Sequence, residues 1–353
     1  MKIYKLELEN FRGYEKFSCQ FNRGINIVLG ENGVGKTTII EALNLLVTTK
    51  SFKTNHLEEL ISYDSIKTKI SLRVDEFTKY SFSMSKDEKK FSINNNKVKK
   101  LSDYIGNIIS LLTVPSNHLL IDGQPSFFRN FIDMTLSIID MVYLKNLKEY
   151  QKLVKQKQSY LELVLKDKKI KIDNGLMKIF QDQIYKKIFI IQEKRKDFLD
   201  LLNENFKKKD KFNISNDLSI KSNYFKYKDE VLENQADIIN SIKNSNVLAK
   251  TQYLIEYKGK NARFNASTGQ IRMILIIICF SIYEILKKNK SNIQVLLLLD
   301  DILTELDDNN KKIVLESIPD DIITVLTHPG IKIDENIFNK NIVNIININN
   351  EKR

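Results

Sequence analysis

The 353-residue chain is long enough for two or three domains or one large composite domain, and its 42% apolar content can form a core, which excludes global disorder. Two cysteines and three widely separated histidines match neither a disulfide framework nor a metal-binding spacing, and the longest apolar stretch, residues 273–280, is too short to span a bilayer, so we expect a cytoplasmic protein with no membrane role. The formal charge of +12 points to an anionic partner, most often nucleic acid, although a lysine-rich composition can also reflect genomic base bias.

Residues 1–105 alternate short β-like runs with turns, and one of these runs, residues 25–29, precedes a glycine-rich loop. The loop reads Gly30-Glu31-Asn32-Gly33-Val34-Gly35-Lys36-Thr37 and fits G-x-x-x-x-G-K-[ST] at every fixed position, with a helix predicted from Thr38 through Leu46. Glycines let successive amides turn inward on phosphate oxygens, and the helix N-terminus adds its partial positive charge. Lys36 can reach the β- and γ-phosphates of a nucleoside triphosphate, and the Thr37 hydroxyl can ligate Mg²⁺. The pattern predicts a nucleotide site.

Much of the excess positive charge falls in one fifth of the chain. Between residues 145 and 211, 19 lysines and arginines stand against 10 acids, a net charge of +9. Apolar residues recur there at helical spacing in two runs, separated by the polar stretch 166–175. They are Leu144, Leu147, Val154, Leu161 and Leu165 in the first run, and Ile184, Ile188, Ile191, Phe198 and Leu202 in the second. We predict a short antiparallel helical hairpin, whose charge is either a DNA-binding surface or simply a solvated helix face.

Residues from about 212 onward hold a second mixture of helices and strands, including the fully apolar run 295–299. Such a run suits a strand buried on both faces, as in a parallel sheet. It ends in Asp300 and Asp301, at the place where a nucleoside triphosphatase needs a carboxylate. We assign Asp300 to the Mg²⁺ shell and Asp301 to polarising the attacking water. Lys36 and Asp300 are 264 residues apart, so a large insert separates the two halves of this site.

A second group of motifs surrounds the acidic strand. Ser267-Thr268-Gly269-Gln270 begins an apolar helix 33 residues before Asp300 and resembles the S-x-G-Q signature of ABC-type ATPases, in which a serine contacts the γ-phosphate bound to a second subunit. Thr304-Glu305-Leu306-Asp307 resembles the D-loop that crosses the dimer interface of these ATPases. His328 follows an apolar run at the position of their switch histidine, although a lone histidine is as often structural.

Five further segments match one family in register. Residues 6–14 look like L-x-L-x-N-F-R-N-Y, residues 38–42 like N-x-L-E-A, and residues 51–53 like S-[FH]-R. Residues 115–133 follow the spacing of P-E-D-L-x-L-V-x-G-x-P-x-x-R-R-x-F-[LI]-D, and residues 259–263 precede the signature as G-K-D-A-R. Together with the order of the motifs, these segments make the chain resemble the RecF family of bacterial recombination mediators over nearly its whole length. SMC proteins share the order, but their inserts are coiled coils of hundreds of residues.

The chain departs from the family pattern at two places. Ser116 and Asn117 replace the acidic pair of P-E-D. The family segment G-P-H-R-D-D is absent from residues 247–252, where only a cation at Lys250 survives. These departures concern turnover and partner coupling. They leave Lys36, Thr37, Ser267, Asp300 and Asp301 unchanged.

The resemblance implies an α/β fold, an ABC-type ATPase head with mixed sheets and an inserted helical lobe. The expected parts are residues 1–105 and 212–353 for the head and 106–211 for the lobe that contains the hairpin. The expected cofactors are ATP and Mg²⁺. The implied nucleotide-binding residues are Gly30, Glu31, Asn32, Gly33, Val34, Gly35, Lys36, Thr37 and Thr38 of one subunit and Ser267, Gly269 and Gln270 of the other. Thr37 and Asp300 would hold the metal, and Asp301 and His328 would be catalytic. Arg12 is expected to contact a phosphate of nucleotide or DNA.

The same resemblance implies a function and its partners. We expect an ATP-dependent homodimer that clamps single-stranded or gapped DNA without sequence specificity and hydrolyses ATP slowly. With recombination mediator proteins it would help to load recombinase in DNA replication, recombinational repair and the SOS response, at the nucleoid in the cytoplasm. An ATP-gated DNA-binding module with little or no hydrolysis is the alternative. A third possibility, an ABC transporter subunit, would need a membrane partner and a small helical lobe rather than a basic hairpin.

Overall fold

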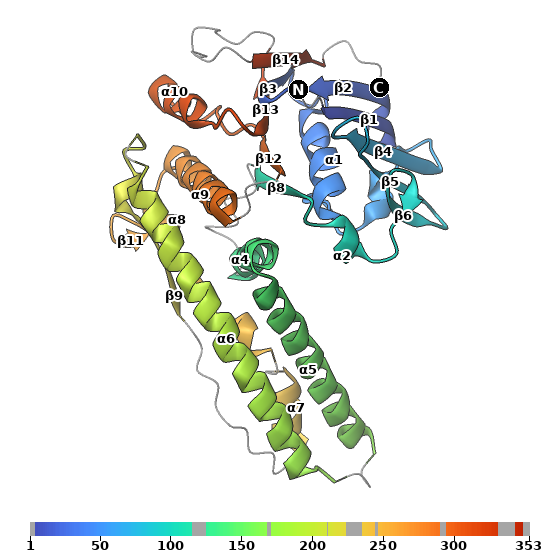
Figure 1. Ribbon diagram of the computed structural model, residues 1–353, viewed down its shortest axis with the longest axis vertical. Helices are drawn as coiled ribbons and strands as arrows, with labels where there is room; N and C mark the ends of the chain where they lie inside the picture. The colour runs from blue at the N-terminus through green and yellow to red at the C-terminus, as the bar shows by residue number, and fades with distance from the viewer. Residues whose placement is uncertain are drawn as a thin grey trace. The chain divides into compact units, whose positions relative to one another are not determined.

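The computed structural model describes residues 4–114, 125–167, 171–209, 211–223, 235–243, 246–289, 294–330 and 343–348. The chain divides into two compact units. One unit, which we call the head, consists of Met1–Asn117 and Ser267–Arg353, and the other, the helical unit, consists of His118–Ala266. The two halves of the head are therefore separated by one continuous insert, as the colours of Figure 1 show.

An antiparallel sheet forms one layer of the head, with the strand order β2-β1-β4-β5-β6-β7. Its strands are β1 (Tyr4–Phe11), β2 (Tyr14–Phe21), β4 (Lys67–Arg73), β5 (Lys79–Ser85), β6 (Lys89–Ile93) and β7 (Asn96–Lys97). Successive side chains point to opposite faces of a strand. The neighbours Leu8, Ile70 and Phe82 are therefore buried on one face, whereas the opposite face carries mainly serine and lysine residues.

A parallel sheet forms the second layer, with the order β14-β3-β13-β12-β8. Its strands are β3 (Gly24–Gly30), β8 (Ile108–Thr113), β12 (Gln294–Leu299), β13 (Ile323–Pro329) and β14 (Val343–Asn347). All seven residues of β3 are buried, as expected for a central strand covered on both faces. The predicted strands 25–29 and 295–299 lie within β3 and β12, and the prediction of an α/β head with mixed sheets is confirmed.

Two helices cover opposite faces of the parallel sheet. The α1 helix (Lys36–Thr48) contacts strands of both sheets, and its Asn44 accepts a hydrogen bond of 3.1 Å from Ser110 of β8. The α9 helix (Thr268–Asn289) packs on β8, where Cys279 Sγ lies 3.2 Å from Thr113 Oγ1. Residues 110 and 113 of one strand face opposite sides, which places α1 and α9 on the two faces. In the described part of the head, the other helical segments are η1 (Leu57–Leu60), α2 (Leu101–Tyr104) and α10 (Asp308–Ser317).

By length and composition alone, α9 could cross a membrane, which the short apolar stretch 273–280 did not indicate. However, 83% of its most apolar 18-residue window is buried inside the protein. Its apolar side chains are already covered by the head. The same composition is typical of the core helix of a soluble domain, and α9 occupies that position here.

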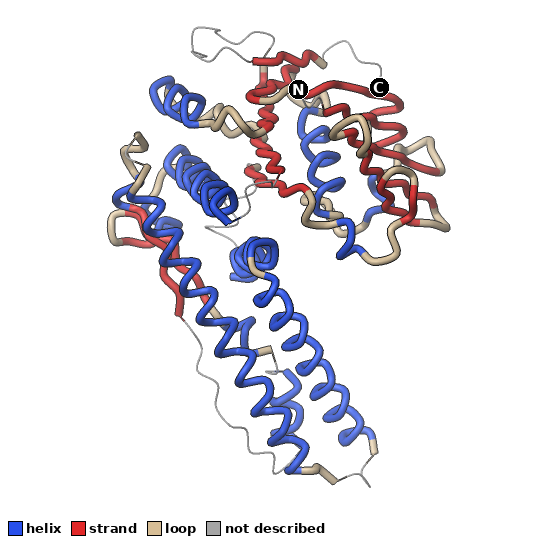
Figure 2. The backbone as a smooth tube through the Cα atoms, in the orientation of Figure 1, coloured by secondary structure: helices blue, strands red, loops and turns tan. Residues whose placement is uncertain are grey.

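The helical unit is built on two long helices, α5 (Met141–Lys166) and α6 (Asn174–Lys207), which pack side by side and run in opposite directions (Figures 1 and 2). Asp140 and Asp173 cap their N-termini through side-chain hydrogen bonds to backbone amides. The two predicted apolar runs lie within α5 and α6. The other described elements of the unit are α4 (Pro125–Ile139), α7 (Gln235–Lys243), α8 (Ala262–Asn265), η3 (Ser215–Asp217), η4 (Val247–Lys250) and the three-stranded sheet of β9 (Leu218–Asn223), β10 (Gln252–Tyr257) and β11 (Lys260–Asn261).

The boundaries between the units differ from those predicted at residues 105 and 211. Residues 108–113 form β8 of the parallel sheet and so belong to the head. Residues 212–266 belong instead to the helical unit. The Asn203 side chain of α6 exchanges two hydrogen bonds with the backbone of Ile220, of 3.0 and 2.8 Å, and Arg129 of α4 donates to the Thr251 carbonyl at 2.8 Å. The insert therefore ends directly before Ser267.

Candidate nucleotide-binding site

The loop between β3 and α1 has a backbone that requires its glycines. Gly33 and Gly35 have φ angles of 82° and 94°, in the left-handed region that strains residues with a side chain. At Gly35 an added Cβ would also lie 2.7 Å from the hydroxyl oxygen of Tyr14. This position therefore excludes a side chain for two independent reasons. The strand, loop and helix follow one another as the motif predicts.

Lys36, the first residue of α1, folds its side chain back over this loop. Its Nζ donates hydrogen bonds to the carbonyls of Gly30 and Glu31 at 2.7 and 2.8 Å. Burial lowers the pKa of Lys36, and the nearby carboxylates Asp301 and Asp300 oppose that shift. The positive charge of Lys36 is thus held at the loop, close to both carboxylates.

The end of β12 meets the loop at Asp300. This residue is 3% exposed, and its Oδ1 accepts hydrogen bonds from Thr327 Oγ1 at 2.7 Å and from Thr37 Oγ1 at 3.2 Å. The contact joins residues 263 positions apart in the chain. A hydroxyl and a carboxylate in contact are hard oxygen donors of the kind that Mg²⁺ prefers. The pair predicted to hold the metal is therefore brought together, and its chemistry fits that ion.

Two polar atoms beside this pair are buried with no hydrogen-bond partner in the described part of the chain, Asp301 Oδ1 and His328 Nδ1. Burial raises the pKa of Asp301 and lowers the pKa of His328. The β13–β3 register pairs His328 with Leu29, next to the start of the loop. Buried polar atoms usually have a protein, water or ligand partner. Both predicted catalytic side chains therefore lie at the site with one hydrogen-bonding atom each available to a ligand.

The signature segment forms an exposed N-terminus of α9. Ser267 Oγ accepts from the Gln270 amide at 3.3 Å, and Gln270 Oε1 accepts from the Ser267 amide at 2.8 Å, a reciprocal capping box. Gly269 lies against the D-loop, since an added Cβ would be 3.1 Å from the carbonyl oxygen of Glu305. No hydrogen bond among the described residues joins Ser267, Gly269 or Gln270 to the glycine-rich loop of the same chain. The signature is thus presented to solvent.

Arg12, expected to contact a phosphate, instead forms a two-point ion pair with the fully buried Glu41. The distances are 2.8 Å from Nη2 to Oε1 and 3.1 Å from Nε to Oε2. Ser51 donates a hydrogen bond of 2.5 Å to the same carboxylate. Arg12, Glu41 and Ser51 come from three of the segments that resemble the RecF family. The presence of all three segments was the signal in the sequence for this cluster. That they meet one another was not predicted.

A second buried ion pair lies in the helical unit, where the fully buried Arg195 of α6 contacts Asp133 of α4. The distances are 2.9 Å from Nε to Oδ1 and 2.8 Å from Nη2 to Oδ2. The hydroxyl of Tyr143 on α5 donates to the same carboxylate at 2.5 Å. The charge of Arg195 therefore serves to join three helices and is not available to DNA.

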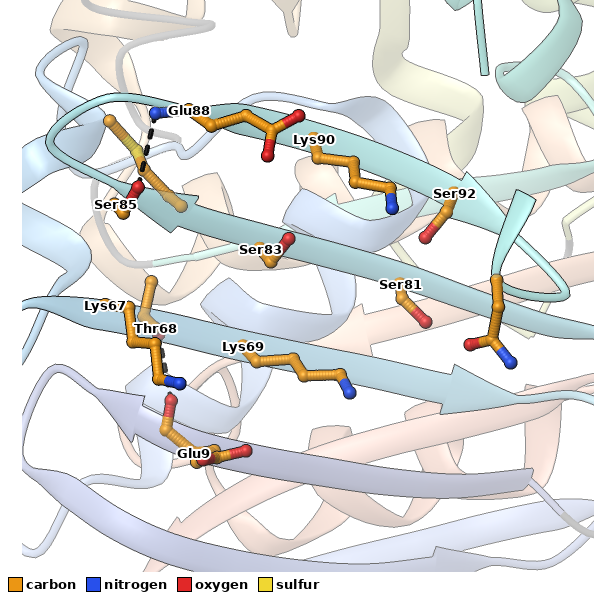
Figure 3. A pocket seen from close by; sticks show the side chains of 12 residues that line it. Glu9, Lys67, Thr68, Lys69, Ser81, Ser83, Ser85, Glu88, Lys90 and Ser92 are labelled. Carbon is orange, nitrogen blue, oxygen red and sulfur yellow. Dashed lines mark hydrogen bonds between the residues drawn. The ribbon is translucent and has the colours of Figure 1, made fainter. Parts of the chain in front are cut away.

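The polar face of the antiparallel sheet is hollowed, which the sequence analysis did not indicate (Figure 3). The hollow has a volume of about 530 Å³. Its floor includes Ser81 and Ser83 of β5, and its walls include Lys67 and Lys69 of β4 and Lys90 of β6. These three lysines have no ion-pair partner among the described residues, whereas the acids at its rim are Glu9 and Glu88. The face can therefore attract an anion.

The fold, the glycine-rich loop, the acidic end of β12 and the exposed signature define the head of an ABC/SMC-type ATPase. The family model of the RecF/RecN/SMC N terminal domain matches residues 2–109. A Smc head domain from Pyrococcus yayanosii, 16% identical, shares the fold with a TM-score of 0.53 over 93% of this chain and 92% of that chain.

Closer similarity is found to proteins named RecF. The DNA replication and repair protein RecF of Acholeplasma laidlawii strain PG-8A is 30% identical over 320 residues, which cover 86% of this chain and 87% of that protein. A solved structure of the recombination mediator protein RecF-ATP in the RecFOR pathway is 25% identical, with a TM-score of 0.76 over 94% of each chain. This chain belongs to the RecF family.

Proposed function

We propose that this protein is a DNA replication and repair protein that binds ATP, closes as a homodimer on single-stranded or gapped DNA, and hydrolyses ATP slowly. With recombination mediator proteins it helps to load recombinase in recombinational repair and the SOS response, in the cytoplasm at the nucleoid. The observation that carries the proposal is the contact between Thr37 and Asp300, next to buried atoms of Asp301 and His328 that have no hydrogen-bond partner among the described residues. The names of the RecF relatives supply the cellular process.

Residues 30–38 would bind the triphosphate. Their glycines expose backbone amides, and Lys36 would exchange its two carbonyl contacts for phosphate oxygens. Thr37 and Asp300 would hold Mg²⁺, which when bound neutralises charge on the phosphates. Asp301 would accept a proton from the attacking water, a role that its raised pKa favours because a more basic carboxylate is the better acceptor. His328 would donate a hydrogen bond to an oxygen of the terminal phosphate group through Nδ1, which has no partner among the described residues.

The signature would complete the site only from a second copy of the chain. Ser267, Gly269 and Gln270 lie on an exposed helix end, with no hydrogen bond to the loop of their own chain among the described residues. A helix N-terminus with a serine attracts the γ-phosphate, which ADP lacks. Two such contacts, related by symmetry, would make the dimer stable with ATP and unstable with ADP.

DNA would be held by the cationic surfaces of both units. The segment 145–211 has a net charge of +9, and the hollowed sheet face adds Lys67, Lys69 and Lys90. Phosphate contacts carry no sequence information and release counterions, so binding should be independent of sequence and strongly dependent on salt. The serine hydroxyls on the floor of the hollow are suitable donors to phosphate oxygens.

Single-turnover ATP hydrolysis with and without gapped DNA tests the enzymatic part. We expect slow hydrolysis that DNA stimulates, weak ATP binding by Lys36→Arg, and a rate at least about tenfold lower for Asp301→Asn with ATP binding retained. Equal rates for the wild type and Asp301→Asn would refute hydrolysis at this site. Size measurement of Asp301→Asn in ATP and in ADP tests the dimer, and a monomer in both nucleotides would refute the composite site.

An ATP-gated DNA-binding module without turnover is the second candidate. The replacement of the acidic pair by Ser116 and Asn117, which lie outside the described residues, and the presence of Asp301 where many ABC ATPases carry a glutamate both favour it. Under this alternative Asp301→Asn leaves the rate unchanged, whereas ATP-dependent dimerisation and salt-sensitive DNA binding persist. The single-turnover hydrolysis measurement therefore separates the two candidates, because both predict an ATP-dependent dimer.

A further inference from the structure

Arg272 connects the signature helix to the D-loop within one head. It lies on α9, five residues after the signature serine, and its side chain is 10% exposed. Its Nη1 donates to the carbonyl oxygen of Asp301 and, at 3.0 Å, to Thr304 Oγ1. Its Nη2 forms an ion pair of 2.9 Å with Glu305. One buried guanidinium thus contacts three positions of the segment that follows β12.

The carbonyl that Arg272 contacts belongs to a strained residue. Asp301 has a φ of 48°, in the left-handed region that residues with a side chain rarely adopt. Its amide donates to Thr327 Oγ1 at 2.8 Å, and its carbonyl accepts from both Arg272 and Thr304. This conformation directs the Asp301 side chain, whose Oδ1 has no partner in the described residues. The orientation of the carboxylate therefore depends on what holds the backbone.

A separate contact joins the same two segments nearer the signature. An added Cβ at Gly269 would lie 3.1 Å from the carbonyl oxygen of Glu305, so the first turn of α9 lies directly against the D-loop. Arg272 stands about one helical turn further along α9. The signature helix and the D-loop thus contact each other at two successive turns of α9, through close packing at Gly269 and through the guanidinium group of Arg272.

We propose that Arg272 is a positioning residue that makes the signature of a head and its own Asp301 move as one unit. It acts by fixing the left-handed backbone of Asp301 and the D-loop against α9. The inference rests on the proposed function, in which Asp301 serves the nucleotide of its own head and the signature serves that of the partner. Closure of one composite site would then be transmitted, through Arg272, to the carboxylate of the other.

The test compares Arg272→Lys and Arg272→Met with Glu305→Gln and with Tyr283→Phe. Glu305→Gln removes only the ion pair. Tyr283→Phe removes a hydrogen bond of 2.5 Å from the far end of the same helix to Asp321 and serves as the control for loss of stability alone. Lysine keeps the charge but cannot span the separate acceptors that a guanidinium fork reaches. The first measurement is amide hydrogen exchange of residues 301–306 in the full-length, nucleotide-free protein.

We expect faster exchange of residues 301–306 in both Arg272 variants, little change in Tyr283→Phe, and an intermediate result for Glu305→Gln. In hydrolysis, kcat should fall about 10- to 100-fold in both Arg272 variants while KM for ATP changes less than about threefold, since a misplaced catalytic group slows chemistry without weakening phosphate binding. Unchanged exchange in both Arg272 variants, or a kcat in them equal to that of Tyr283→Phe, would overturn the proposal. If the wild type proves not to hydrolyse ATP, the hydrolytic part of the proposed function fails, and exchange together with dimerisation in ATP still decides the role of Arg272.

Discussion

The ion pair between Arg12 and Glu41 gives the sharpest test of what holds the head together. Glu41 of α1 is fully buried, and its carboxylate accepts hydrogen bonds from Nε and Nη2 of Arg12 and from the hydroxyl of Ser51. Arg12→Leu leaves the Glu41 charge buried with a single remaining partner. Breaking a buried pair from one side costs about 3–5 kcal/mol. Because the Arg12 side chain is 23% exposed, water can reach part of the site, and we expect the lower figure, about 3 kcal/mol.

The assay is thermal and urea unfolding of the nucleotide-free protein, with Arg73→Leu on the exposed face of β4 as the matched control. A loss of about 3 kcal/mol corresponds to a fall in Tm of about 6–12 °C for a unit of roughly 200 residues. The double variant Arg12→Leu with Glu41→Leu should regain a large part of the loss, because no unpaired charge remains. A single variant within about 0.5 kcal/mol of the Arg73→Leu control would refute the reasoning.

Three further predictions concern separate parts of the head. Gly35→Ala should abolish measurable ATP binding in a fluorescent-nucleotide titration, since alanine at a φ of 94° is strained and its Cβ would lie 2.7 Å from the Tyr14 hydroxyl oxygen and 2.9 Å from the nearest ring carbons. Lys69→Glu combined with Lys90→Glu should weaken DNA binding and reduce the slope of log K against log salt by about 1.4–1.8, and an unchanged slope would exclude the sheet face from DNA contact. Alkylation of the native protein, followed by mass spectrometry, should modify Cys19 and spare Cys279, because complete burial raises the pKa of the Cys279 thiol to about 11 and withholds the reactive thiolate.

Features encoded in contiguous residues could be predicted from the sequence. The glycine spacing of residues 30–37 and the apolar runs in β3 and β12 each specify a local conformation, and each is found at the predicted place. Thr37 and Asp300 were both predicted to hold the metal, and they meet because β3 and β12, which flank β13 in the parallel sheet, end at the same edge. In these cases the local signal and the tertiary structure agree.

Features that depend on which distant segments of the chain contact each other could not be predicted from the sequence. Residues 212–266 contain β-like runs that read equally well as part of the head, and only contacts such as Asn203 with Ile220 assign them to the helices. Arg12 is a cation in a loop, and nothing local distinguishes a phosphate partner from Glu41. The alternation of lysine and serine in β4 and β5 does indicate a polar face. Its hollow, however, depends on the order and twist of β4, β5 and β6.

The capping box of α9 would allow the signature to bind a phosphate, as proposed above, without local rearrangement. Among the described residues, Ser267 Oγ acts only as an acceptor, from the backbone amide of Gln270, and no acceptor for its hydroxyl hydrogen is found there. Ile271 already bonds to the Ser267 carbonyl, whereas the amides of Thr268 and Gly269 have no partner among the described residues. Two amides and one hydroxyl therefore stand preformed at a positive helix end. In the proposed dimer, capping would use a lone pair of Ser267 Oγ and phosphate binding would use its hydrogen. The preference for ATP over ADP would then follow from the γ-phosphate itself, and ATP would select the closed dimer without refolding the signature.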